Sequence, residues 1–347
     1  MENVTRFAAV NTKIRSLQGK FLKDKDYINM LEKNSVKDVA NYLKDNTYYG
    51  EMLQDINLEN ISRRDLENIL RNYLIKNVEK IRHYFNGNYK KFIKSLYVKY
   101  EIEDLKSFAR LIFNGTELDS YEKTFVFVGK YSDVEPEKVF ASKTIGDLIG
   151  AFEGSEFYKY IEPILKGKRK SLFYLEMALD MAYYSIIQRY WKMISKSDRQ
   201  ILEKMEGIIA DLFNIQWIYR GMKFYSLSPE EILNYTIDFG DKLTYNERKA
   251  LCYAKSLDEF FALTKESTPY SFLFNKEIID LYMERRINRY IYFKLRALER
   301  TAMMNIIHVV AYILFLEFEI RDIISITESI RYNMPFDEAK KFLIREI

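Results

Sequence analysis

Cysteine and histidine are nearly absent from this sequence. The chain contains one cysteine, Cys252, and two histidines, His83 and His308. A single thiol cannot form an intramolecular disulfide, which is typical of a protein from a reducing compartment. Neither a Cys-x-x-Cys nor a His-x-x-x-His spacing occurs, and transition-metal sites commonly use such spacings. We therefore expect neither a metal site nor a bound cofactor.

Proline and glycine are also scarce, with 5 and 12 residues among 347. Both residues interrupt helices, so their scarcity over this length favours long helices. Strand candidates are few, and the apolar segment Phe125–Val128 is too short to anchor a sheet. The sequence therefore predicts an all-α fold. Long helical patterns of apolar residues cover about 62–85, 171–195, 200–224 and 276–330.

Motifs for nucleotide binding and for helical diphosphate chemistry are missing as well. The chain has no Gly-x-x-x-x-Gly-Lys-[Ser/Thr], no Gly-x-Gly-x-x-Gly and no Asp-Asp-x-x-Asp. The first two cradle phosphates on backbone amides, and the third binds metal and diphosphate. Their absence disfavours the corresponding enzyme classes, and we expect no catalytic residues.

The charge balance and the apolar runs argue against two further classes. The chain has 54 basic and 50 acidic residues, a balance too even for a nucleic-acid footprint. Its most apolar stretch, Ala302–Leu316, is bordered by Arg300 and Glu317 and is shorter than the roughly 20 residues that cross a bilayer. We expect this stretch to be a helix buried in the protein, with no direct membrane span.

The amino-terminal segment has the pattern of an amphipathic helix. Its apolar residues Phe7, Val10, Ile14, Leu17 and Phe21 follow one another at steps of three and four. Such steps place them on one face of a helix, with charged residues elsewhere. We expect this helix to pack against the rest of the protein.

Internal repetition is the most informative feature of the sequence. Three stretches align without gaps, at Glu101–Arg110, Asp211–Arg220 and Glu319–Glu328. Each begins with an acid, continues with Asp or Asn three positions later, and then has Leu or Ile. The second motif position recurs at intervals of 110 and 108 residues. The motif residues that we single out for a role in repeat packing are Glu101, Asp104, Arg110, Asp211, Asn214, Arg220, Glu319 and Asp322.

A second pattern recurs at nearly the same period. Its copies are Val36, Val39 and Tyr49, then Ile145, Leu148 and Tyr158, then Leu257, Phe260 and Tyr270. Two independent patterns with one order and one period predict a single protein of three pseudo-repeated helical units. We place the approximate repeats at 1–118, 119–228 and 229–347.

The charged positions of the motif have two interpretations from sequence alone. They could form a charge clasp that fixes where one repeat meets the next. They could equally be the flanks of an ordinary amphipathic helix, because exposed pairs contribute only about 0–1 kcal/mol. Their recurrence in three repeats favours a packing role and does not suggest catalysis.

These features together resemble the family of C subunits of the V/A-type rotary ATPases (ATP synthases), which is related to the d subunit of the eukaryotic V-ATPase. The opening segment Arg6–Leu17 is similar to that family's first helix. The motif copies at Glu101–Arg110 and Asp211–Arg220 and the threefold repetition complete the resemblance, which covers the full length.

The resemblance implies a funnel of three helical lobes with pseudo-threefold symmetry. Such a protein is non-catalytic and is monomeric within its complex, at the cytoplasmic face of the membrane. It would bind the central-stalk subunits and the membrane rotor ring, transmitting torque for ion transport linked to ATP hydrolysis or synthesis. No nucleic-acid partner is implied.

Two other classes remain open at this point. One is a generic α-helical scaffold or regulatory protein that binds partners on a concave face, although most solenoids repeat at about 20–50 residues. The other is a helical enzyme with an unrecognised site, which a polar pocket with convergent titratable groups would support.

Overall fold

Helices make up all the regular structure that we describe. The structure is a computed structural model, and it describes residues 2–116, 125–166, 172–274 and 279–347. Every regular element within these ranges is an α-helix or a 3-10 helix, which confirms the all-α fold. The segment Phe125–Val128 forms no strand and lies in an irregular connection.

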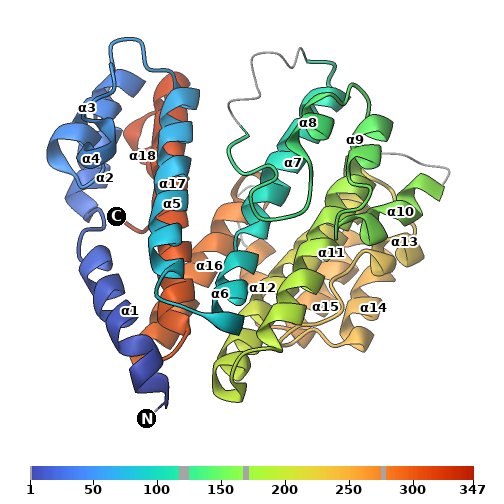
Figure 1. The fold of residues 1–347 in the computed structure, drawn as a ribbon. Coiled ribbons are helices and arrows are strands. Elements are labelled where there is room, and N and C mark those ends of the chain that lie inside the picture. Colours follow the sequence, from blue (N-terminus) through green and yellow to red (C-terminus); the bar gives the residue numbers. More distant parts are fainter. Residues whose placement is uncertain (1, 117–124, 167–171, 275–278) are drawn as a thin grey trace.

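Three long helices carry the repeated sequence motif, and each packs lengthwise against a second long helix. The motif helices are α7 (Val98–Phe113), α12 (Lys196–Phe224) and α17 (Ile307–Arg331). Figure 1 shows α17 beside α5 although α5 comes from the amino-terminal part of the chain. The helices paired with α7, α12 and α17 are, in that order, α11 (Leu172–Trp191), α16 (Ile279–Thr301) and α5 (Arg63–Arg82), and α16 also packs against α17.

Short helices fill the chain between the two long helices of a pair. Between α7 and α11 lie α8 (Pro136–Phe140), α9 (Ile145–Ala151) and α10 (Tyr158–Lys166). Between α12 and α16 lie α13 (Pro229–Asn234), α14 (Tyr245–Cys252), α15 (Leu257–Ser267) and the 3-10 helix η2 (Ser271–Phe274).

The short helices that pack against α17 come from both ends of the chain. It packs against α18 (Phe336–Lys340) after it, and against α2 (Asp24–Leu31) and α3 (Val36–Asn46) from the amino-terminal part. The remaining helices are α1 (Glu2–Gln18), α4 (Gly50–Leu53) and α6 (Gly87–Ser95).

The predicted repeat boundaries and the funnel symmetry stay predictions. The boundary between residues 118 and 119 lies outside the described residues, and that between 228 and 229 falls at the start of α13. The packing groups each motif helix with helices that follow it in the chain, or, for α17, with both chain ends.

Equivalent short helices begin with equivalent caps. The side chains of Ser35, Thr144 and Ser256 each accept a hydrogen bond from a backbone N–H three residues later, at the starts of α3, α9 and α15. Such a cap contributes about 1 kcal/mol by pairing a donor that the helix leaves free. These caps therefore fix the starts of three corresponding helices, at the same spacing as the second sequence pattern.

The amphipathic helix at the amino terminus packs within the protein. Phe7, Val10 and Ile14 of α1 are at most 1% exposed, and α1 lies against α17 (Figure 1). The sequence prediction for this segment is therefore confirmed.

The most apolar stretch of the sequence is also internal. Residues 302–306 form a connection and the remainder of the stretch begins α17, whose Val309 and Ala311 are fully buried. Within the described ranges, no helix is both long enough and apolar enough to cross a membrane. The predicted buried helix is confirmed, although it begins at Ile307 and not at Ala302.

Candidate functional site

The first motif residue of α7 is a buried carboxylate that binds a loop. Glu101 is fully buried, and it accepts hydrogen bonds from the N–H groups of Gly129 at 2.8 Å and Tyr131 at 3.1 Å, and from the Ser132 hydroxyl at 2.5 Å. Burial raises the pKa of Glu101, and these hydrogen bonds oppose the rise. Three donors from one segment therefore hold that segment against α7.

The second motif residue of α7 binds the same segment slightly earlier. Asp104 is 1% exposed, accepts a hydrogen bond from the N–H of Phe127 at 2.8 Å, and forms an ion pair with Arg71 of α5. Burial raises the pKa of Asp104 to about 6, although Arg71 lowers it. Asp104 thus joins α7 both to the loop that follows it and to α5.

The motif of α12 repeats this arrangement with different donors. Asp211 is fully buried and accepts from the N–H groups of residues 241, 242 and 243 at 3.1, 2.7 and 3.2 Å, and from the Tyr270 hydroxyl at 3.0 Å. Burial raises the pKa of Asp211, and these hydrogen bonds oppose the rise. Asn214 exchanges two hydrogen bonds with the backbone of Ile237, at 2.7 and 3.0 Å. An amide suits this position because it can both donate and accept.

In α17 the first motif acid binds the amino-terminal part of the chain. Glu319 accepts from the N–H of Leu22 at 2.7 Å, from the hydroxyl of Tyr49 at 3.0 Å and from that of Tyr48. Burial raises the pKa of Glu319 to about 7, although the hydrogen bonds from these donors lower it. Tyr49 and Tyr270 are corresponding members of the second sequence pattern, so the two patterns meet at Asp211 and at Glu319.

The second motif acid of α17 binds the carboxy-terminal part. Asp322 accepts from the N–H groups of Ile344 at 2.7 Å and Arg345 at 3.1 Å. Burial raises its pKa to about 7. Glu319 and Asp322 therefore hold the two ends of the chain on one helix.

Two glycines allow the loops to wrap around these acids. Gly129 has a positive φ of 73°, and a Cβ added to it would lie 2.5 Å from the Pro136 ring, so a side chain would be strained there. A Cβ added to Gly240 would lie 2.0 Å from a carboxylate oxygen of Asp211. Close approach of backbone to carboxylate thus requires glycine at residue 240.

The structure separates the motif into two parts. Its acids and Asn214 bind backbone segments, whereas Arg110 and Arg220 lie on the wall of a cavity. Sequence reasoning missed the partners of the acids because most are backbone amides, which any residue except proline supplies. The role of the motif in repeat packing stays a prediction.

A cavity of about 720 Å³ lies between the long helices, and all three motif helices line it. The lining residues Leu96, just before α7, Glu206, in the first half of α12, and Val310, in the first turn of α17, are at most 5% exposed. Towards the other ends of α7 and α12, the lining residues Arg110 and Arg220 are exposed. We call the side of the cavity where the motif helices begin its closed end, and the side where α7 and α12 end its mouth.

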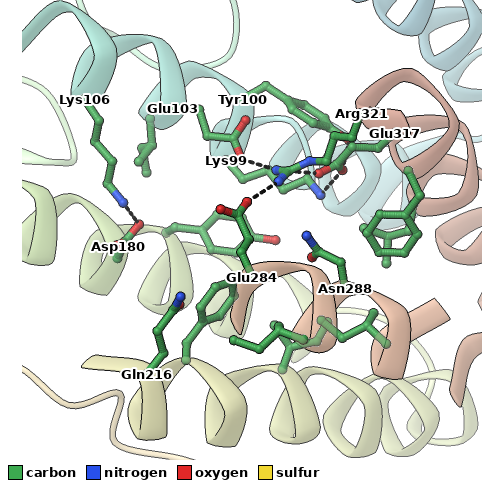
Figure 2. Close-up of a pocket in the computed structure, with 18 of the residues that line it drawn as sticks. Lys99, Tyr100, Glu103, Lys106, Asp180, Gln216, Glu284, Asn288, Glu317 and Arg321 are labelled. Carbon is green, nitrogen blue, oxygen red and sulfur yellow. Dashed lines mark hydrogen bonds and ion pairs between the residues drawn. The ribbon is translucent and has the colours of Figure 1, made fainter. Parts of the chain in front are cut away.

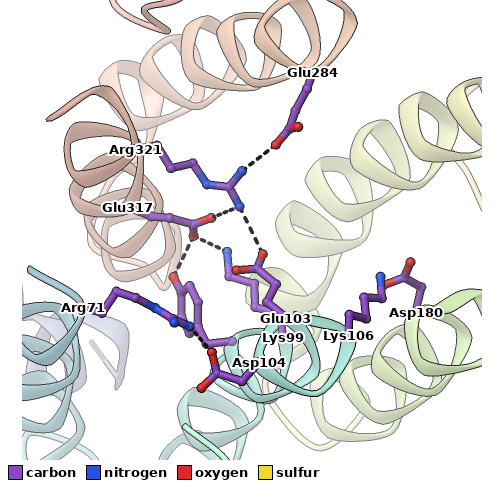
Figure 3. A network of polar contacts seen from close by, with 10 residues as sticks. Arg71, Lys99, Glu103, Asp104, Lys106, Asp180, Glu284, Glu317 and Arg321 are labelled. Atoms are coloured by element: carbon purple, nitrogen blue, oxygen red, sulfur yellow. Dashed lines mark hydrogen bonds and ion pairs between the residues drawn. The ribbon is translucent and has the colours of Figure 1, made fainter. Parts of the chain in front are cut away.

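A network of charges crosses the cavity (Figures 2 and 3). Glu317 of α17 pairs with Lys99 of α7 and, at 3.1 Å, with Arg321 one turn along α17. Arg321 also reaches Glu103 of α7 at 3.1 Å and Glu284 of α16 at 2.8 Å. Burial raises the pKa of Glu317, but Lys99 and Arg321 outweigh it and hold the pKa below its usual value. One arginine thus connects three helices.

A second set of ion pairs joins α7 to α11 along the same cavity. Lys106 pairs with Asp180, as Figure 2 shows, and Arg110 pairs with Glu176 at 2.6 Å. These pairs place the cationic part of the α7 motif on the cavity wall.

One lining carboxylate has no such partner. Glu206 of α12 is 5% exposed, and among the described residues it forms no hydrogen bond or ion pair that we find. Burial raises its pKa to about 7, and the charge of Lys99 only partly opposes that rise.

A buried aspartate connects the starts of the helices at the closed end. Asp198, at the start of α12, accepts from the hydroxyls of Tyr89 and Ser195 and, at 3.3 Å, from the N–H of Ile306 just before α17. Arg6 of α1 donates to the Tyr89 hydroxyl at 3.0 Å. Three segments distant in sequence therefore meet at one carboxylate, and α1 joins them through the Tyr89 hydroxyl.

Fold and site together define an all-helical protein organised around a large charged cavity. Across the described ranges, no group of three or more His, Cys, Asp and Glu side chains is arranged to hold a metal ion. The family model of the ATP synthase (C/AC39) subunit matches residues 10–342. The chain belongs to this family, and it is a non-catalytic part of a rotary ATPase complex.

Individual relatives agree over most of the chain. The C subunit of the A-type ATP synthase of Methanocaldococcus jannaschii is 24% identical over 97% of this chain and 86% of its own length. The proteins of that name from Methanosphaera stadtmanae and Pyrococcus abyssi are 24% and 21% identical over 96% and 98% of this chain, and over 86% and 90% of their own lengths. The resemblance stated from the sequence is confirmed.

Replacing Glu101 by alanine should destabilise the protein and release the loop after α7. Glu101→Ala leaves the N–H groups of Gly129 and Tyr131 without their acceptor, at a cost of about 1–3 kcal/mol for each buried donor. We expect the free energy of unfolding, measured by chemical denaturation, to fall by about 3 kcal/mol. Hydrogen exchange at the same two amides should accelerate.

The matched control is Glu103→Ala on the same helix. The Glu103 side chain is 46% exposed and forms an ion pair with Arg321, so its loss should cost only about 0–1 kcal/mol. Equal losses for the two variants would contradict a special role for the buried acid.

Replacing Glu206 by glutamine should change how stability depends on pH. The pKa of Glu206 in the folded protein, about 7, lies above the value of about 4.3 in an unfolded chain. The folded state then binds the proton more tightly, so this group stabilises fully below about pH 4.3 and loses that contribution as pH rises towards about 7. Glu206→Gln should not lose stability in this way. At pH 8 its free energy of unfolding should exceed that of wild type by up to about 3 kcal/mol.

Chemical denaturation of both proteins at pH 5 and pH 8 measures this difference. The raised pKa values of Glu319 and Asp322 act alike in both proteins and cancel in the comparison. Glu284→Gln, at a side chain that is 71% exposed, serves as control. Parallel pH profiles for wild type and Glu206→Gln would show that Glu206 ionises normally.

Proposed function

We propose that this protein is a central-rotor subunit that couples the central stalk of a V/A-type ATPase to its membrane rotor ring. In this role it takes the end of the stalk in its cavity, binds the ring with its closed end, and transmits torque. Ion transport is thereby linked to ATP hydrolysis or synthesis. The relatives are named as C subunits of A-type ATP synthases, which supports membership of such a complex.

The cavity is the observation that carries the proposal. An α-helix with its side chains is about 10–12 Å wide and rises 5.4 Å per turn, so one turn occupies roughly 500 Å³. The cavity of about 720 Å³ therefore has room for about one to two turns of a helix end. It opens at a mouth and has a closed end, which is the form that a socket requires.

Cross-links between the helices support a load-bearing role. Asp198 joins the starts of α12 and α17 at the closed end and also accepts from the hydroxyl of Tyr89 in α6. A part that transmits torque must turn as one body, and these contacts resist sliding of one helix pair past another.

The closed end offers a separate apolar surface for the ring. Tyr84, Met193 and Met303 are 43%, 44% and 87% exposed, and each lies in or beside the connection that leads from one helix pair to the next. We call these three residues the apolar connections. Because the three side chains occupy corresponding connections, they are the residues that we expect to contact the ring.

This proposal places the protein at the cytoplasmic face of the membrane, held there by the ring, with one copy in each complex. A generic helical scaffold, the other class that the sequence left open, would bind neither stalk nor ring. Cross-linking and binding to these two partners therefore separate the two functions.

Cysteines introduced at the two ends should cross-link to different partners. The natural thiol, Cys252, is 1% exposed and burial raises its pKa to about 12, so its background reactivity is low. In the assembled complex, Gln216→Cys in the cavity should cross-link to a stalk protein. Met303→Cys should cross-link to the ring, and mass spectrometry identifies each product.

Lys265→Cys, exposed on α15, is the control and should give neither product. The proposed arrangement would be overturned if the cavity cysteine cross-linked to the ring. It would also be overturned if neither introduced cysteine cross-linked to another subunit of the ATPase.

A charge at the apolar connections should weaken ring binding and leave stalk binding intact. Met303→Asp places a carboxylate where we expect an apolar contact, which costs about 1–3 kcal/mol, or roughly ten- to hundredfold in affinity. Pull-down of the ring and of the stalk by the purified variant measures both contacts. Loss of both, or of the stalk alone, would contradict the assignment of the two ends.

A further inference from the structure

The closed end of the cavity contains a carboxylate without a charged partner in the described part of the chain. Glu206 lines the cavity on the same face of α12 as Ile209 and Phe213, which are three and seven positions later. It is 5% exposed. No hydrogen bond or ion pair of its side chain is found within residues 2–116, 125–166, 172–274 and 279–347, so its charge is unpaired within those ranges.

The neighbouring cations are engaged elsewhere. Lys99, the cation that acts on Glu206 most strongly, pairs with Glu317 and lies 4.7 Å from the centre of the Tyr100 ring. Arg321 divides its guanidinium among three acids, including Glu317. Moving either cation to Glu206 would take from the buried Glu317 one of the two cations that pair with it.

The other titratable groups that face Glu206 cannot neutralise it. Tyr183 and Tyr184 of α11 are close enough that the Glu206 charge raises their pKa values, after the larger effect of burial. Phenols can donate a hydrogen bond but carry no positive charge. The environment of Glu206 is therefore apolar and aromatic, with one cation already committed.

A helix end that fills the cavity would remove the remaining water from this carboxylate. An unpaired ion then becomes strongly unfavourable, whereas a close opposite charge with good geometry offsets the loss of solvation. The chemistry of the site thus selects an occupant that is positively charged at its tip.

We propose that Glu206 is the receptor for a lysine or arginine side chain at the tip of the stalk helix that enters the cavity. The proposal rests on the proposed function, since it names the chemistry of the same occupant. Glu206 would then contribute to the choice of partner, because an uncharged tip would leave the carboxylate buried and unpaired.

The test measures binding of the purified stalk protein to the full-length chain at pH 8 by isothermal titration calorimetry. Glu206→Gln should weaken binding at least tenfold, whereas Glu284→Gln at the exposed wall should change it less than threefold. The variant Glu206→Lys should weaken it more, and changing one basic residue at the stalk tip to glutamate should restore its binding.

Proton release on binding separates the two roles of Glu206, because a residue with only a structural role would not change its protonation when the stalk protein binds. Near pH 7 a large share of Glu206 is protonated in the free protein, so pairing with a cation should release a fraction of a proton. Titration in two buffers of different ionisation enthalpy should detect this release for wild type and not for Glu206→Gln.

The outcomes distinguish the two proposals. If wild type does not bind the stalk protein, the proposed function fails and this inference fails with it. If wild type binds and Glu206→Gln binds equally well, with the same proton release, the function stands and the receptor role of Glu206 is overturned.

Discussion

Burial of acids on the motif helices is the constraint on which the rest of the fold depends. Glu101, Asp211 and Glu319 are at most 4% exposed, and a buried carboxylate is tolerated only where several donors converge on it. For Glu101 and Asp211 those donors are mainly successive backbone amides of the segment that follows. The segment must therefore bend around the acid before the short helices begin, which sets their position against the motif helix. The opposite face of the same helix remains available for the cavity.

The two faces satisfy their charges in different ways. The acids on the backbone face bind amides that cannot be withdrawn without unfolding the loop. On the cavity face, Glu317, Arg321 and Glu103 pair through side chains, which can turn to new partners at a cost of about 0–1 kcal/mol where they are exposed. An entering helix could thus exchange contacts with the cavity wall while the loops bound by the buried acids stay in place. A socket needs this combination of a fixed frame and an adaptable lining.

The sequence predicts the helical class, the period and the family, because scarcity of proline and glycine and the spacing of Glu101, Asp211 and Glu319 are properties of residues in order. It does not predict what those acids bind, since backbone amides leave no signature in the sequence. The grouping of helices is hidden for another reason. The short helices of α17 come partly from residues 24–46, at the far end of the chain. Glu206 is equally hidden among 50 acids, because only its position in the cavity distinguishes it.

Closure of the chain on α17 has a mechanical consequence in the proposed rotor. In the groups around α7 and α12, the bound loop is covalently continuous with its motif helix. Around α17, Glu319 holds Leu22 and Asp322 holds Ile344 and Arg345, so one side of that group is joined only by noncovalent bonds. Torque that crosses this side passes through the Glu319 carboxylate and the buried side chains of α1 and α5. Stiffness there must come from desolvated hydrogen bonds, which are stronger in a low-dielectric interior than in water, and this accounts for placing Glu319 out of contact with solvent.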